Sequence, residues 1–135
     1  MRVYVAGSSN ELTRAKAAIA LVRAAGHEVT SDWPPVIEKQ GEANPRDVTI
    51  VLRAGWADMA TRGITLADVV WLLAPEVGMA RGAFFEFGFA FAQGKPVIVS
   101  GPEHACSVFT ALGVECATDA EGYGTLLTYA EMRGV

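Results

Sequence analysis

Short apolar runs alternate with longer mixed segments along the whole chain. The runs with the length and β-branched content of strands are "RVYVAG" (2–7), "HEVTSDW" (27–33), "DVVWLLAP" (68–75), "PVIVSG" (96–101) and "VECAT" (114–118). The intervening segments predict helices over 11–25, 82–93 and 107–113, and from about residue 119 onward. Alternating strands and helices favour an α/β fold, and we expect a doubly wound, five-stranded parallel sheet in a single domain, 1–135.

Residues that favour helix ends mark the first predicted helix. Ser8 and Glu11 have the spacing of a capping box, and Gly26 fits a C-terminal signal. We therefore expect local residues to cap this helix at both ends.

The segment between the second and third predicted strands is less regular. Residues 34–42 show no clear pattern. Asn44 as N-cap and Pro45 at the first helical position predict a helix that runs to about Arg62.

Two loops are the places to search for a ligand. In a doubly wound sheet, ligands bind beyond the carboxyl ends of the strands, where "GSSN" (7–10) and "APEVGMARG" (74–82) lie. Both loops lead into helices, whose free N–H groups attract anions. Neither contains a Walker A or GxGxxG pattern, so ATP or NAD binding would rest on fold alone. Ser8 and Ser9 either bind a ligand or only cap a helix, and the sequence leaves both open.

The helix predicted at 82–93 is rich in phenylalanine and carries one acid, Glu86. At about 100° per residue, the aromatic rings fall on two stripes that we expect to face the core. The stripes are Phe84, Phe87 and Phe91, and Phe85 and Phe89. Glu86 lies outside both, beside the small residues Gly82 and Ala83, which leaves room for a ligand.

The ionisation of Glu86 depends on two opposed effects. The helix dipole favours the carboxylate anion, whereas apolar walls raise its pKa, and the sequence does not decide between them. An ionised, desolvated carboxylate suits a nucleophile that attacks the anomeric carbon of a sugar. The alternative is a solvent-exposed glutamate on an otherwise buried helix.

Composition excludes several classes of protein. With 51% hydrophobic residues, 19% charged residues and a net charge of −4, the chain is predicted to be globular and not to bind nucleic acid. Cys106 and Cys116 lack metal-ligand spacing, so we expect free thiols, no metal and a cytoplasmic location. No apolar run approaches the roughly 20 residues of a membrane span, and no membrane association is expected.

Four segments together resemble the nucleoside 2-deoxyribosyltransferase-like family, which includes 2'-deoxynucleoside 5'-phosphate N-hydrolases. They are "YVAGSS", "RAAGHEVTSDW", "ADVVWLLAP" and "RGAFFEFGFAFAQGKPVIVSG". The most specific part is Gly-x-x-x-Glu-x-Gly from Gly82 to Gly88, followed by "GKPVIV". The resemblance implies a flavodoxin-like fold in which Glu86 is the catalytic nucleophile.

The resemblance also implies roles for residues elsewhere in the chain. Tyr4 and Gly7 match the family's first-strand residues, and Ser8 matches a residue that helps to bind the sugar or its 5' group. Asp58 corresponds to an acid that contacts the base and assists its departure, although the family's spacing to the third strand would place Ala60 there. Ser107 matches a residue that reaches across a dimer interface, which implies a homo-oligomer with shared sites.

Recognition of the 5' group departs from the family's pattern. Asn10 stands where the monophosphate hydrolases have arginine, and Ala80 where they have serine and the transferases have aspartate. Arg81 or Arg14 could compensate, so Asn10, Arg81 and Gly82 complete the predicted substrate-binding set.

The predicted activity is cleavage or transfer at the N-glycosidic bond of a 2'-deoxynucleoside or its 5'-monophosphate, with no cofactor. Interception of the sugar ester by water would make the protein a hydrolase, and interception by a second base a transferase. Two alternatives are a non-catalytic nucleotide or nucleotide-sugar sensor and a flavodoxin-like electron carrier.

Overall fold

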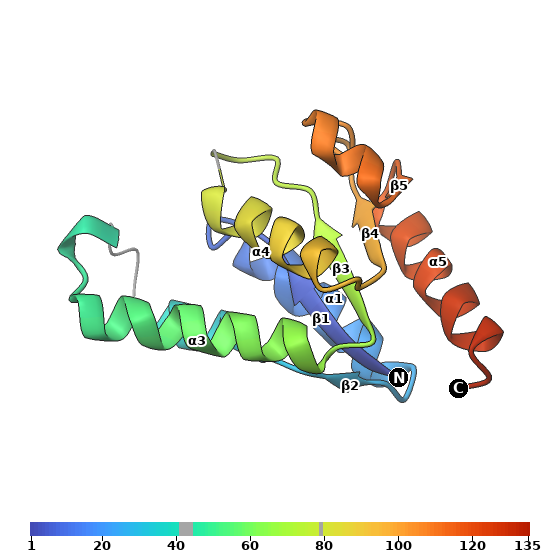
Figure 1. The fold of residues 1–135 in the computed structure, drawn as a ribbon, viewed down its shortest axis with the longest axis horizontal. Coiled ribbons are helices and arrows are strands. Elements are labelled where there is room, and N and C mark those ends of the chain that lie inside the picture. The colour runs from blue at the N-terminus through green and yellow to red at the C-terminus, as the bar shows by residue number, and fades with distance from the viewer. Residues whose placement is uncertain (41–44, 79) are drawn as a thin grey trace.

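The computed structural model describes residues 1–40, 45–78 and 80–135 (Figure 1). Its parallel, five-stranded sheet has the order β2-β1-β3-β4-β5. The strands are β1 (Arg2–Ala6), β2 (Glu28–Val29), β3 (Val69–Leu73), β4 (Val97–Ser100) and β5 (Val114–Cys116). The chain proceeds outward from β1 to β2 and then returns through β3, so the predicted doubly wound sheet is confirmed.

Helices cover both faces of this sheet (Figure 1). The α-helices are α1 (Leu12–Ala24), α2 (Trp33–Gln40), α3 (Ile50–Leu66), α4 (Arg81–Ala92) and α5 (Asp119–Met132). Two 3₁₀ segments, η1 (Pro45–Asp47) and η2 (Val108–Leu112), complete the described elements. Helices α3 and α4 pack together on one face, and α1 and α5 pack together on the other.

The core lies between the helices and the two central strands. All five residues of β3 are buried, as predicted for a strand covered on both faces. Helix α4 packs on the sheet through Ala83, Phe87 and Ala90. The same helix carries Glu86, so the rigid centre of the fold holds the acid in place.

The ends of α1 only partly follow the prediction. Gly26 adopts a φ of +82°, which is the left-handed conformation expected after a helix. The capping box is wrong, because Ser8 Oγ accepts a hydrogen bond from the Asn10 amide (3.1 Å). The Glu11 side chain instead accepts hydrogen bonds from Arg14 and from the amide of Glu76.

The largest corrections fall between the second and third strands. β2 is limited to Glu28–Val29, and Trp33 begins α2, a helix that the sequence pattern did not predict. The predicted N-cap Asn44 lies outside the described residues. Helix α3 begins later than expected, at Ile50, because the Thr49 side chain accepts a hydrogen bond from the Leu52 amide and caps it.

The prediction that both phenylalanine stripes of α4 face the core is also wrong. Phe87 is buried, whereas Phe85 and Phe91 are 62% and 48% exposed. The helix buries only one narrow face against the sheet, and its flanks turn toward α3 and toward η2. No helix in the described ranges is long and apolar enough to cross a membrane.

Candidate active site

A cavity of about 470 Å³ lies beyond the carboxyl end of β1. Residues 7–10 of the β1–α1 loop, the start of α4 and side chains from α2 and α3 form its walls. The lining residues are Tyr4, Gly7, Ser8, Ser9, Asn10, Trp33, Ile37, Trp56, Met59, Ala60, Ala80, Arg81, Gly82, Ala83 and Glu86. This is the crevice that the order of the strands predicts for a ligand.

Glu86 lines this cavity from the second turn of α4. Its Oε2 atom is buried and has no hydrogen-bond partner, while Tyr4 is hydrogen-bonded to the carboxyl group. Burial raises the pKa of Glu86 to about 7, and the bond from Tyr4 lowers it only in part. Desolvation therefore outweighs the Tyr4 hydrogen bond, and the second carboxyl oxygen has no hydrogen-bond partner among the described residues.

Tyr4 is held in place by a close approach of α3 to β1. Its side chain is 1% exposed. A Cβ atom on Gly63 of α3 would lie 2.8 Å from Tyr4 Cδ2 and 2.9 Å from Cε2, so only glycine fits there. Burial, followed by the nearby Glu86, raises the pKa of Tyr4, which keeps the hydroxyl protonated as a donor.

The structure brings most of the predicted binding residues together. Tyr4, Gly7, Ser8 and Asn10 come from β1 and its loop, and Arg81 and Gly82 come from the start of α4. The space predicted beside Glu86 is present, because Gly82 carries no side chain there and leaves this wall open.

Asp58 does not join this group. It is not among the residues that line the cavity, and its exposed carboxylate forms an ion pair with Arg62 (2.9 Å). The next residues, Met59 and Ala60, line the cavity instead. Ala60 is thus the residue of α3 at the position where the resemblance places an acid.

Arg14 is also unavailable to a substrate. Its guanidinium donates to both carboxylate oxygens of Asp119 (2.7 and 2.9 Å) and to Glu11 (3.1 Å). It also donates to the backbone carbonyls of Ala74 (2.6 Å) and Ser100 (3.1 Å). Arg14 therefore ties the carboxyl ends of β3 and β4 to α1 and α5, and the prediction that it could hold a phosphate loses its basis.

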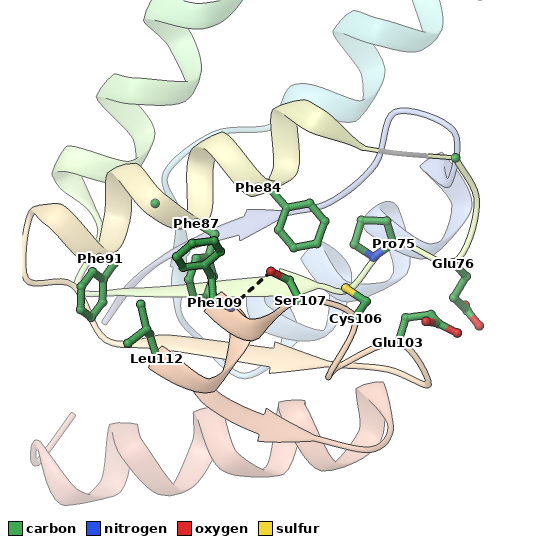
Figure 2. A pocket seen from close by; sticks show the side chains of 12 residues that line it. Pro75, Glu76, Phe84, Phe87, Phe91, Glu103, Cys106, Ser107, Phe109 and Leu112 are labelled. Carbon is green, nitrogen blue, oxygen red and sulfur yellow. Dashed lines mark hydrogen bonds between the residues drawn. The ribbon is translucent and has the colours of Figure 1, made fainter.

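Ser107 lies in a different place, a cavity of about 920 Å³ between α4 and η2 (Figure 2). Its hydroxyl accepts a hydrogen bond from the Phe109 amide (3.2 Å) and caps η2. Phe84, Phe87 and Phe91 of α4 face this segment across the cavity. Within one chain, Ser107 therefore does not reach Glu86.

The sequence did not single out the aromatic wall of the smaller cavity. Trp33 lies at the start of α2, and its indole N–H donates to the Val5 carbonyl (2.8 Å), which fixes the ring. Trp56 and Met59 come from α3. A helical projection of 50–66 places Trp56, Met59 and Gly63 on one side of α3, and this is the signal that could have found the wall.

Among their described lining residues, neither cavity offers a recognisable metal site. Over residues 1–40, 45–78 and 80–135, no group of three or more His, Cys, Asp or Glu side chains could hold an ion. Both cysteines are free.

Two solved enzyme structures share this fold. CMP N-glycosidase BcmB from Clostridium botulinum matches with a TM-score of 0.61 and 18% identity over 96% of this chain and 99% of that chain. A 2-deoxyribosyltransferase from Bacillus psychrosaccharolyticus matches with a TM-score of 0.57 and 21% identity over 76% of this chain and 73% of that chain. No family model and no curated protein matches the sequence. The chain thus shares the flavodoxin-like α/β fold of these two structures.

Proposed function

We propose that the protein cleaves the N-glycosidic bond of a 2'-deoxynucleoside or its 5'-monophosphate. The observation that carries this proposal is the buried, unpartnered Oε2 of Glu86 in a cavity of about 470 Å³. The fold shared with a deoxyribosyltransferase and a CMP N-glycosidase adds support. A structural glutamate has no need of an unpartnered oxygen that faces a cavity, because leaving a buried polar atom unbonded is unfavourable.

In the proposed reaction, Glu86 attacks C1' of the sugar. The C1'–base bond breaks as a bond forms between the carboxylate and C1', and the carboxylate offsets the positive charge that develops there. Tyr4 holds the carboxyl group through its hydrogen bond and thereby orients it toward the cavity. Water or a second base then attacks the ester and releases Glu86.

The polar side of the cavity is the proposed place for the sugar and its 5' group. Ser8, Ser9 and Asn10 contribute hydroxyl and amide groups, and Arg81 provides a cation that lines the same cavity. Because neutral groups outnumber cations there, we propose that a free 5'-hydroxyl is accepted at least as well as a 5'-phosphate.

We also propose that a second copy of the chain covers the larger cavity. Val108 and Phe109 of η2 are 82% and 64% exposed, and Phe91 of α4 lies beside them. So large an apolar surface is typical of an interface. Phe109→Ser should shift the mass measured by light scattering to that of a monomer, whereas a monomeric wild type would contradict this part of the proposal.

A panel assay tests the activity. The protein is incubated with the four common deoxynucleosides and their 5'-monophosphates, with and without an acceptor base. Free base indicates hydrolysis and an exchanged nucleoside indicates transfer, and Glu86→Gln should abolish either product. A ligand-induced shift in melting temperature without any product would favour the sensor alternative. The departures from the family's pattern at Asn10 and Ala80 are the reason to consider that alternative.

A further inference from the structure

The wall of the Glu86 cavity contributed by α2 and α3 is entirely apolar. It consists of Trp33, Ile37, Trp56, Met59 and Ala60. The other walls contain the loop after β1 and the start of α4, where the polar groups lie. If the sugar occupies the polar side, the base lies against the apolar wall.

None of the ionisable side chains among the described lining residues is suited to protonate a departing base. Arg81 is a guanidinium, a type of group that does not act as a proton donor in catalysis. Tyr4 is buried and its hydrogen bond is directed at Glu86. Glu86 must itself be ionised to act as a nucleophile. The base must therefore leave without a proton from these groups.

Helix α3 also contributes no acid to the wall where the base is expected to lie. Asp58 is turned outward and paired with Arg62, and the residues that line the cavity in its place are Met59 and Ala60. General acid catalysis by α3 is thus absent from this arrangement, although such catalysis commonly contributes about 10²–10⁴-fold to a rate.

Two kinds of base can leave without receiving a proton. A neutral base such as uracil leaves as an anion, which would be placed in an apolar slot beside the Glu86 carboxylate, and both features destabilise an anion. A base that is already positively charged leaves as a neutral molecule. Before cleavage, its charge is favoured by the aromatic faces of tryptophan and by the nearby carboxylate.

We infer that this cavity selects nucleosides whose base carries a positive charge, such as an N-alkylated base, and releases that base as a neutral molecule. This inference rests on the function proposed above. The bond from Glu86 to C1' forms, the C1'–N bond breaks, and its electron pair returns to the ring nitrogen and cancels the charge. No proton moves in this step. Water then cleaves the ester, giving the free sugar and the carboxylate and releasing one proton to solvent.

Matched nucleosides test this selection. The first pair is 7-methyl-2'-deoxyguanosine and 2'-deoxyguanosine, the second is 3-methyl-2'-deoxycytidine and 2'-deoxycytidine, and 2'-deoxyuridine tests departure as an anion. For each compound, kcat/KM is divided by the rate of spontaneous cleavage, because a cationic base also leaves faster in water. Cleavage that persists with Glu86→Gln is subtracted.

We expect the acceleration to be at least about tenfold larger for the methylated member of each pair, a difference of about 1.4 kcal/mol in transition-state stabilisation. Equal or larger acceleration of the neutral members, or of 2'-deoxyuridine, would overturn the inference while leaving the proposed function intact. If no compound is accelerated, the proposed function itself fails.

A substitution on α3 gives a second test. Ala60→Asp places an acid at the apolar wall, and Ala60→Asn has nearly the same shape without one. The kcat/KM for neutral deoxynucleosides should be several-fold higher in Ala60→Asp than in Ala60→Asn. The difference in acceleration between the methylated and the neutral member of each pair should also be smaller in Ala60→Asp. If the two variants have the same kcat/KM for neutral deoxynucleosides, the lack of an acid at this wall does not limit their cleavage, and the inference fails.

Discussion

Helix α4 contributes to two cavities that differ in size and in chemistry, besides a shallower one beside Phe89. The larger one, about 920 Å³, lies between α4 and η2, and phenylalanine side chains face it (Figure 2). In the smaller one, about 470 Å³, Glu86 is the one acid among the described lining residues, and one of its carboxyl oxygens is buried and unpartnered. The larger cavity also has acids among its lining residues, Glu76 and Glu103. Burial raises the pKa of Glu86 to about 7.

The difference shows that volume does not identify the reactive site. A large apolar hollow gains free energy by being covered, as a protein interface does. A buried carboxylate without a full set of partners is unfavourable for folding, and such arrangements gather where a ligand supplies the missing interaction. Pairs of matched substitutions in the two cavities can test this contrast.

The largest effect is expected from Glu86→Gln. Without an ionisable oxygen at C1', turnover of the best substrate in the panel should fall by about 10³-fold or more. The matched control is Glu103→Gln in the larger cavity, which should keep turnover within about twofold. Steady-state kinetics of both variants give the comparison, and similar losses in the two would remove the distinction between the cavities.

The same pair of variants should differ in how stability depends on pH. The folded-state pKa of Glu86 is raised from 4.5 to about 7. Between these values the native state binds the proton more tightly than the unfolded chain does, so stability falls as the pH rises from about 4.5 to 7. Glu86→Gln should therefore be more stable than wild type by about 3 kcal/mol at pH 8, and by much less at pH 5.

Urea denaturation at pH 5 and pH 8 measures this difference. Glu103→Gln should show no comparable gain at the higher pH. If the stability of Glu86→Gln relative to wild type is the same at pH 5 and pH 8, the carboxyl group of Glu86 is not desolvated in the folded state.

Gly63→Ala tests the support beneath Glu86. The added methyl would meet the Tyr4 ring at 2.8 Å, and we expect a loss of about 1–3 kcal/mol of stability together with lower turnover. Gly55→Ala is the control on the same helix, because nothing lies within 4 Å of its added Cβ. That substitution should stabilise the protein by about 0.5–1 kcal/mol. Thermal or urea unfolding measures the stability of both variants. Equal changes in stability for Gly63→Ala and Gly55→Ala would show that the contact between Gly63 and Tyr4 is not close.

Tyr4→Phe should change the pH dependence of the reaction. The hydrogen bond from Tyr4 lowers the pKa of Glu86, so its removal should move the rising limb of kcat/KM to higher pH. In wild type this limb should be centred near pH 7, because the nucleophile must be ionised. At pH 7 the variant should lose about tenfold in kcat/KM and recover part of that loss at pH 8.5. An unshifted profile would show that Tyr4 does not act through Glu86.

The smallest effect is expected from Asp58→Asn. Because the carboxylate points away from the cavity and pairs with Arg62 in solvent, turnover should stay within about twofold and stability within about 0.5 kcal/mol. A loss of tenfold or more in turnover would restore Asp58 to the catalytic group.

The sheet and the position of Glu86 could be predicted because they depend on local periodicity. The buried run 69–73 is β-rich and bounded on both sides, and the spacing of Gly82, Ala83 and Glu86 places small residues beside the acid on any regular helix.

The rest of the site depends on contacts that local periodicity does not contain. Helix α2 begins with Trp33 followed by two prolines, a start that resembles a loop until the helix packs on the body of the fold. Arg14 looked available because its partner, Asp119, is 105 residues away in the sequence. Asp58 lies away from the cavity because α3 packs through the side that carries Met59 and Ala60, and a weakly amphipathic helix does not reveal from its sequence which side packs on the sheet.

Rapid quenching of the reaction shows whether Glu86 forms a covalent bond to the sugar. The protein is mixed with excess substrate, stopped in acid within the first turnover and digested, and the mass of the peptide that contains Glu86 is measured by mass spectrometry. We expect a peptide heavier by one deoxyribosyl group in wild type and the unmodified mass in Glu86→Gln. Efficient turnover in which that peptide stays unmodified, with a product of inverted configuration at C1', would contradict it.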